Sequence, residues 1–253
     1  MEIVQAYATK NRCYQAAIPL YPQGIMLHSI GCPQPNADVM ARYYNQYQPG
    51  GESVCVHGFI QRDGTYYQTL PYNLRAWHCG GAANATHIGI EMTEPASIVY
   101  TGGASWRDLD PVATETHVRG TYDASVELFA QLCTQFDLDP LADGVIISHA
   151  EGAERGIASA HADPTHLWRA FGLTMDGFRA DVAAKMAAGN TDEEDDDMAT
   201  RYNTVAELPT WAQEETQKLI DRGALLGDEH GNLDVTMDML RTMIVCQRMV
   251  DGK

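Results

Sequence analysis

The chain has 253 residues, of which 45% are hydrophobic and 20% charged, so it can bury a core and is not a disordered chain. Its 17 basic and 34 acidic residues give a formal net charge of −17 at pH 7. This excess of negative charge argues against a nucleic-acid binder, which needs Lys and Arg to neutralise phosphates, and against attraction to an anionic membrane surface. The length predicts one large domain, or one domain with a small appendage.

The first residues lack the basic start and the continuous apolar core of a signal peptide, so we expect synthesis in the cytoplasm without a leader. No stretch approaches the roughly 18 uninterrupted apolar residues that membrane insertion needs. Six cysteines are scattered along the chain without a close pair. In a leaderless chain, this favours reduced, mostly buried thiols over a disulfide framework. They are Cys13, Cys32, Cys55, Cys79, Cys133 and Cys246.

Short apolar runs bounded by turn residues predict buried strands. The expected strands cover residues 24–30, 54–60, 65–70, 87–92 and 144–148. The second and third of these flank Asp63-Gly64, a dipeptide typical of hairpin turns.

Helices are expected where apolar residues recur at three- and four-residue spacing. They cover residues 37–47, 115–136 and 175–187, and Asn36 stands where it can cap the first of them. Residues 94–114 form a long connection with Gly and Pro. Such a connection is unusual in a compact domain unless it is functional.

A block of acidic residues marks the clearest boundary in the chain. Residues 191–200 contain six acidic residues and no basic one, about a third of the net charge. Like charges repel one another and stay solvated, so this block predicts a linker. We therefore expect a large domain over residues 1–188, an acidic linker over 189–200, and a small helical module over 201–253. In that module, helices are expected over residues 209–222 and about 236–249.

Polar side chains stand at the ends of three expected strands. His28, Glu91 and His149 each follow an apolar run, and Asp163 comes shortly after the last of them. Strand ends of an open α/β sheet are where ligand sites collect. Neutral imidazoles and a carboxylate are ligands that Zn²⁺ accepts, and three protein ligands leave its fourth position open. By spacing alone, the favoured interpretation of each histidine is a structural one, satisfied by a backbone group.

Five sequence motifs surround these residues in a fixed order. They are PQGIMLHSIG at 22–31, HGFIQRDGT at 57–65, AWHCG at 76–80, THIGIE at 86–91, and SH at 148–149 followed by HADP at 161–164. The series resembles the zinc-dependent N-acetylmuramoyl-L-alanine amidases of the type 2 amidase and peptidoglycan-recognition family, and most closely amidase endolysins of phages and prophages. It covers about residues 10–188. The resemblance implies an α/β fold, with a central mixed β-sheet flanked by helices and a zinc site in a surface groove.

The resemblance also implies a role for each matching residue. His28, His149 and Asp163 would bind Zn²⁺, and Glu91 would accept a proton from the attacking water and deliver it to the leaving amine. His161 stands where relatives often have Lys, so it would stabilise the oxyanion only when protonated. The position of Asp163 is Cys in some relatives.

Further positions resemble the groove wall of the family. His57, Trp77 and His78 would hold the muropeptide, although packing is an equal alternative for Trp77 and His78. Residues 94–114 would overhang the groove and select the stem peptide. His166 is expected to be a surface residue.

The predicted function is hydrolysis of the amide bond between N-acetylmuramic acid and L-alanine in peptidoglycan, by an endolysin that acts on the wall after release. A non-catalytic peptidoglycan-recognition module and a cytoplasmic wall-recycling amidase are the alternatives. For residues 201–253, cell-wall binding, self-association into a homo-oligomer and docking on the first domain all stay open.

Overall fold

The structure, a computed structural model, describes residues 1–46, 54–199, 201–208, 210–228, 232–236, 239–240 and 243. They belong to two compact units, Met1–Met186 and Ala187–Lys253, which we describe separately. Among the described residues, none of the helices combines the length and the apolar character that a membrane span requires.

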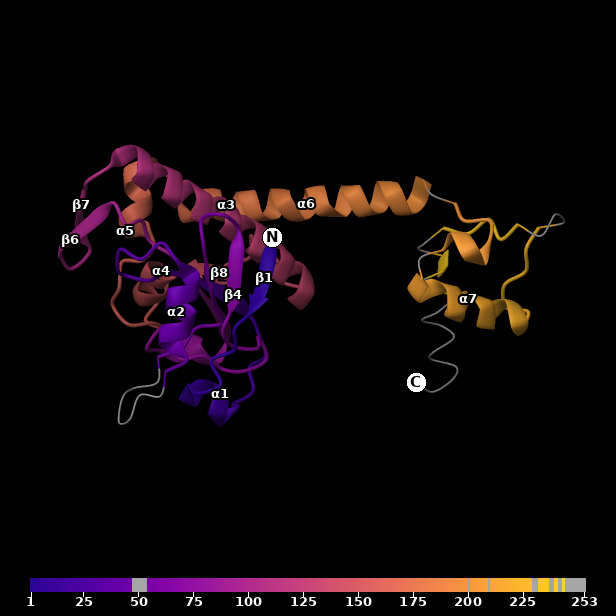
Figure 1. The fold of residues 1–253 in the computed structure, drawn as a ribbon, viewed down its shortest axis with the longest axis horizontal. Helices are drawn as coiled ribbons and strands as arrows, with labels where there is room; N and C mark the ends of the chain where they lie inside the picture. Colours follow the sequence, from indigo (N-terminus) through magenta and orange to yellow (C-terminus); the bar gives the residue numbers. More distant parts are fainter. Residues whose placement is uncertain are drawn as a thin grey trace. The chain divides into compact units, whose positions relative to one another are not determined.

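A six-stranded mixed sheet forms the centre of the first unit (Figure 1), with the strand order β1-β4-β3-β5-β2-β8. The strands are β1 (Glu2–Gln5), β2 (Gly24–Ser29), β3 (Gly58–Ile60), β4 (Thr65–Gln68), β5 (His87–Met92) and β8 (Ile146–Ser148). Only β3 and β4 pair antiparallel, as the predicted hairpin; the other pairs are parallel. The predicted fold class is confirmed, and the five predicted strands are present, although most are shorter than expected. Strand β1 was not predicted.

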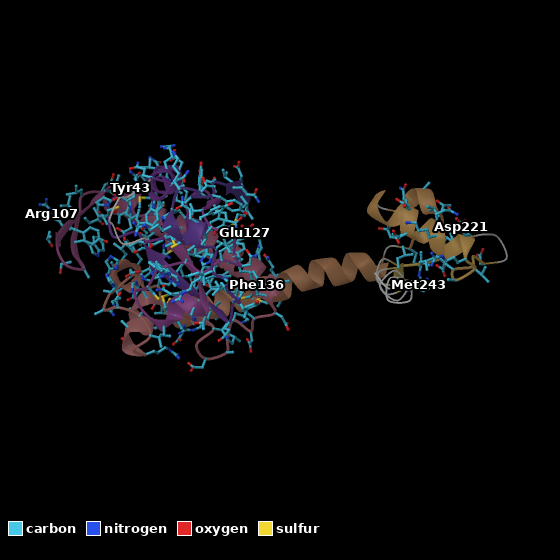
Figure 2. All side chains as sticks on the ribbon, turned by 90° about the horizontal axis from the view of Figure 1, so that it is seen from below. Tyr43, Arg107, Glu127, Phe136, Asp221 and Met243 are labelled. Carbon is cyan, nitrogen blue, oxygen red and sulfur yellow. A yellow bond between two sulfur atoms is a disulfide. The ribbon has the colours of Figure 1, made fainter. Side chains whose placement is uncertain are left out.

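Alternate residues of the central strands point to opposite faces of the sheet. On one face, Leu27 and Ile90 lie in the main core together with helices α3 (Pro111–Phe136) and α6 (Met175–Ala199). On the other face, Met26 packs in a smaller cluster beside η1 (Ala82–Ala85). Helix α2 (Ala37–Tyr44) covers Phe59 on β3. Side chains fill the first unit (Figure 2), and helices flank its sheet as expected.

The helices predicted over residues 37–47 and 115–136 are confirmed with shifted ends. Helix α2 ends at Tyr44, and Asn36 occupies its N-cap position without making a side-chain capping bond. Helix α3 begins at Pro111, earlier than predicted, because Asp110 accepts a hydrogen bond from the Ala113 N–H and Pro suits the first turn.

The connection over residues 94–114 contains secondary structure that was not predicted. Strands β6 (Ile98–Gly102) and β7 (Ser105–Asp108) form an antiparallel hairpin, a second sheet of its own. Short helices that the pattern also missed are α1 (Arg12–Ala16), α4 (His149–Glu154), α5 (Thr165–Trp168) and η2 (Arg169–Phe171). Most β6 and β7 residues are exposed, so the hairpin lacks the apolar alternation that marks a half-buried strand.

The expectation that the cysteines are reduced is wrong for one pair. Cys13 and Cys55 form a disulfide with Cα atoms 6.5 Å apart, which joins α1 to the segment before β3. The expectation relied on compartment alone, and a separation of 42 residues leaves no local signal of the pairing. Cys32, Cys79 and Cys133 are free thiols. Cys246 lies outside the described residues.

The helix predicted over residues 175–187 is longer in the structure, because the backbone of α6 stays helical through the acidic block to Ala199. That residues 189–200 act as a linker between two domains stays a proposal.

The second unit has a small core of its own. Leu208, Leu219 and Val235 are among its buried residues, around α7 (Thr210–Asp221) and the short η3 (Val205–Glu207). Helix α7 confirms the helix predicted over residues 209–222. Most of the second predicted helix, about 236–249, lies outside the described residues.

Phe178 anchors α6 to the main core, and its truncation tests that anchor. The ring is fully buried, with ring centroids 5.1 Å from Phe129 and 5.4 Å from Tyr122. We expect Phe178→Ala to lower the free energy of unfolding by about 3–5 kcal/mol, measured by urea denaturation. Val112→Ala, at a side chain that is 78% exposed on α3, should change it by less than about 0.5 kcal/mol. Equal small effects of both substitutions would contradict the anchoring role.

Candidate functional site

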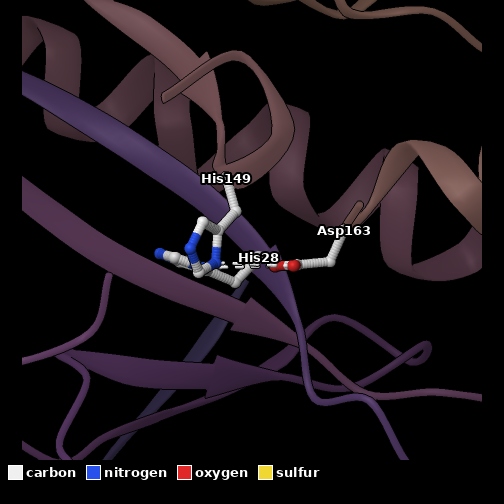
Figure 3. A group of neighbouring side chains, drawn as sticks. All are labelled: His28, His149 and Asp163. Atoms are coloured by element: carbon white, nitrogen blue, oxygen red, sulfur yellow. Dashed lines mark hydrogen bonds and ion pairs between the residues drawn. The ribbon is translucent and has the colours of Figure 1, made fainter. Parts of the chain in front are cut away.

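Three side chains from distant parts of the chain point toward one another at the carboxyl ends of parallel strands (Figure 3). His28 lies near the end of β2, His149 directly follows β8, and Asp163 precedes α5. The His28 Nδ1 is 3.0 Å from the His149 Nδ1 and 3.2 Å from the Asp163 Oδ2. The His149 Nδ1 is 3.4 Å from the Asp163 Oδ1. One candidate ligand atom from each residue lies within 4.8 Å of the others.

The position of His149 depends on the start of helix α4. Ser148 accepts the Glu151 N–H, and the Glu151 carboxylate accepts the Ser148 N–H, so the two residues form a capping box. Arg179 of α6 donates to the same Glu151 carboxylate at 3.0 Å. The Ala150 N–H donates to the Asp163 carbonyl, which holds the Asp163 loop against α4. Helix α6 therefore holds the capping box at the start of α4, and α4 holds the Asp163 loop. Together these contacts orient His149 and Asp163.

For two of the three side chains, His28 and Asp163, the surroundings favour the protonation state that a metal ligand needs. Burial lowers the pKa of His28, although Asp163 opposes this shift. Burial acts to raise the pKa of Asp163, but the adjacent His149 and His28 side chains hold it well below its ordinary value. A neutral imidazole and an ionised carboxylate therefore stand beside the second imidazole at neutral pH. Two imidazole nitrogens and a carboxylate oxygen are a donor set that fits Zn²⁺.

Glu91 stands next to His28, because the two residues are in register on the paired strands β5 and β2. Burial, followed by the nearby Asp163 and Glu94 carboxylates, raises the pKa of Glu91 well above its ordinary value. Its Oε2 is buried and has no hydrogen-bond partner among the described residues. A carboxyl group with a raised pKa and an unused oxygen is suited to proton transfer.

These four residues line a pocket of about 1290 Å³. Trp77, whose side chain is 45% exposed, and His161 also line it, as does His78. The His161 ring lies against His149, with ring centroids 4.5 Å apart, and its Nδ1 is 3.0 Å from the Ser159 Oγ. The structure thus brings seven of the eight predicted site residues to one pocket.

His57 is the exception, and its expected role in substrate binding is corrected. It is fully buried, its Nδ1 accepts the Gly89 N–H, and its Nε2 lies 2.9 Å from the Leu74 carbonyl. Both ring nitrogens are therefore used by the backbone, and the side chain does not line the pocket. Burial lowers its pKa to about 4, so it is a neutral structural histidine.

His78 lines the pocket but has no free ring nitrogen for a muropeptide. Its Nδ1 is 2.8 Å from the His28 Nε2, and its Nε2 is 3.2 Å from the His87 carbonyl. Burial lowers its pKa well below the ordinary value, so this side chain is a neutral neighbour of a candidate ligand.

Residues 94–114 were expected to overhang the groove, and Tyr100 and Gly103 of this segment line the pocket. Tyr100 of the β6–β7 hairpin donates to the Glu94 Oε2 at 2.9 Å, and its hydroxyl oxygen lies 2.6 Å from the His166 Nε2. Trp106 of the same hairpin donates to the His166 carbonyl. The expectation that His166 is a surface residue is wrong, because its side chain is only 8% exposed. The sequence analysis did not single out Glu94, the buried partner of Tyr100.

Comparison with known proteins identifies a family for most of the first unit. Residues 19–166 match the family model described as N-acetylmuramoyl-L-alanine amidase. No curated protein matches the chain.

Solved structures share the fold at low sequence identity. The Staphylococcus aureus hydrolase AmiA, solved in complex with its ligand, has a TM-score of 0.55 and 18% identity over 74% of this chain and 83% of its own. The catalytic domain of XlyA has a TM-score of 0.50 and 20% identity, covering 72% of this chain and 99% of its own. PlyL has a TM-score of 0.50 and 17% identity, covering 73% of this chain and 98% of its own.

Glu94 should make the stability of the protein fall with pH. It is fully buried, and burial raises its pKa to about 7, although hydrogen bonds from Tyr100 and the Gly31 N–H oppose the shift. Its folded-state pKa is thus raised, so unfolding releases a proton, and the free energy of unfolding decreases between about pH 5 and about pH 7, by up to about 3 kcal/mol.

Urea denaturation at both pH values, in the presence of a chelator, measures this decrease. Glu94→Gln stays neutral, so we expect a clearly shallower decrease than in the wild type. The control Glu115→Gln, at a half-exposed position on α3, should keep the wild-type slope. A Glu94→Gln variant with the wild-type slope would show that Glu94 ionises normally.

Proposed function

Because the chain belongs to the N-acetylmuramoyl-L-alanine amidase family, we propose that it hydrolyses the amide bond between N-acetylmuramic acid and L-alanine in bacterial peptidoglycan. One observation carries the proposal: three candidate metal ligands and a partnerless buried carboxyl group meet in one pocket of the matched region. Residues 1–188 would form the catalytic domain.

We propose His28, His149 and Asp163 as the ligands of a Zn²⁺ ion. Their donor atoms are mutually close, and the pKa shifts of His28 and Asp163 favour the forms that coordinate a metal. When bound by three protein ligands, zinc supplies a Lewis acid for the scissile carbonyl and lowers the pKa of water to about 7.

Glu91 is proposed as the group that moves the proton. It accepts a proton from the attacking water and then delivers one to the nitrogen of the leaving L-alanine. The Oε2 that has no protein partner is the atom available for this transfer. The main-chain pairing of β5 with β2 keeps the carboxyl group beside His28, so the proton does not have to travel far.

His161 is proposed to donate a hydrogen bond to the oxyanion that forms on the former carbonyl. Ser159 engages its Nδ1, so Nε2 is the nitrogen available to the substrate. A hydrogen bond of this kind can contribute about 2.7–4 kcal/mol to the transition state. Because relatives often carry Lys here, the oxyanion contact in this chain would depend on pH more strongly than in those relatives.

Trp77 and the β6–β7 hairpin are proposed to hold the rest of the substrate. The half-exposed indole of Trp77 offers an apolar surface in the pocket. Tyr100 and Gly103 of the hairpin segment line the same pocket, so the stem peptide would contact this wall.

We favour an enzyme over a non-catalytic recognition module because His28, Glu91, His149 and Asp163 are all present and gathered in one pocket. A lytic enzyme of phage or prophage origin is favoured over a recycling amidase by the second unit, which has its own apolar core. We propose that residues 201–253 bind the cell wall or associate with a second copy, and that residues 189–200 link them to the catalytic domain.

The proposal is tested with purified peptidoglycan and the full chain. We expect new L-alanine amino termini in the digest and about one zinc ion per chain by elemental analysis. A chelator should abolish the release of amino termini, and added Zn²⁺ should restore it. Binding to peptidoglycan without new amino termini, in zinc-loaded protein, would identify a recognition module instead.

Glu91→Gln tests the proton-transfer role. The variant keeps the size of the side chain but cannot take up the proton, so kcat should fall by about 10²–10⁴-fold while the zinc content is unchanged. Asp163→Ala is the matched comparison, because it should lose zinc and activity together. Near-wild-type turnover of the zinc-loaded Glu91→Gln variant would remove Glu91 from the mechanism.

A further inference from the structure

We propose that His78 is a positioning residue for the proposed zinc ligand His28. It accepts a hydrogen bond from the His28 Nε2, and this keeps the His28 Nδ1 unprotonated and turned toward the metal site. The inference deepens the proposed function and rests on its zinc site. A hydrogen-bond chain runs from the His28 ring through the His78 ring to the His87 carbonyl oxygen, with separations of 2.8 Å and 3.2 Å.

The carbonyl at the end sets the direction of this chain. A carbonyl oxygen only accepts hydrogen bonds, so the His78 Nε2 must carry the hydrogen that it donates to His87. A neutral imidazole has one N–H, which leaves the His78 Nδ1 as an acceptor. The His28 Nε2 must therefore be the donor to His78.

The consequence appears at the opposite nitrogen of His28. With its hydrogen on Nε2, the ring presents an unprotonated Nδ1 toward His149 and Asp163, as metal coordination requires. The competing tautomer would place the hydrogen on Nδ1, where the Asp163 carboxylate at 3.2 Å would accept it. His78 opposes that tautomer, which would block the ligand atom.

The surroundings of His78 leave its ring little freedom. The Asn84 Oδ1 accepts the main-chain N–H of His78 at 2.9 Å. On the neighbouring strand β5, a Cβ added to Gly89 would lie 2.4 Å from the Cγ of His78, so only glycine leaves room for the ring. The glycine within His87–Glu91 is therefore part of the same arrangement.

Ser159 occupies the equivalent place on the second histidine. Its Oγ lies 3.2 Å from the His149 Nε2, so the Nδ1 of His149 is likewise the nitrogen turned toward Asp163. Both candidate ligands thus use Nδ1 toward the site and Nε2 toward a protein partner. The partner of His28 is the better defined, because the His87 carbonyl permits one direction only.

Zinc affinity of His78 variants tests the inference, measured by competition with a chromophoric chelator. His78→Phe keeps a ring but has no acceptor, and we expect about 10–100-fold weaker zinc binding, as for other groups that orient a metal ligand. His78→Asn can place its Oδ1 where the Nδ1 stands, so it should recover most of the affinity. His117→Phe is the matched control, because His117 is also buried and also bonds a backbone carbonyl, that of Thr93, but does not line the pocket.

Wild-type zinc affinity in a folded His78→Phe variant would overturn the inference, as would an equal loss in the Phe and Asn variants. A second readout needs no zinc and no variant that could misfold. In metal-free wild type, long-range ¹H–¹⁵N NMR should show the hydrogen of His28 on Nε2, and a hydrogen on Nδ1 would overturn the inference. If the wild type bound no zinc, the proposed function would fail. The NMR result would still decide which nitrogen of His28 carries the hydrogen.

Discussion

The register between β2 and β5 is the constraint on which the site depends. Parallel pairing places His28 opposite Glu91 and Met26 opposite Gly89, on the face of the sheet away from α3. Leu27 and Ile90, which point the other way, are buried in the main core. A shift of the register by one residue would turn the apolar set out of the core, so the core itself holds the imidazole and the carboxyl group side by side.

Three carboxyl groups, those of Glu91, Glu94 and Asp163, lie at this end of the sheet. Their surroundings shift their pKa values in different directions. The adjacent histidines lower the pKa of Asp163, whereas burial and neighbouring carboxylates raise the pKa values of Glu91 and Glu94. Groups whose pKa values are pushed apart in this way can take different chemical roles in one pocket. In the proposed mechanism, Asp163 binds the cation and Glu91 carries the proton, while Glu94 bonds Tyr100 and helps to hold the wall.

Much of the sheet and of the candidate site could be predicted, for a shared physical reason. Buried strands such as β2 and β5 are apolar runs, and their polar ends, His28 and Glu91, stand out against them. What failed depends on contacts distant in sequence. The exposed β6–β7 hairpin is held by Tyr100 and Trp106 against His166, and the sequence near 98–108 does not show it. The burial of His57 and the pairing of Cys13 with Cys55 likewise have no local signal.

The anchoring of α6 has a consequence for protein engineering. The bond from Arg179 to Glu151 and the packing of Phe178 and Val182 in the main core both lie before the point where the two units divide. A different C-terminal module could therefore be fused after Met186 without removing these contacts. Such a fusion would combine the proposed catalytic pocket with a different binding module.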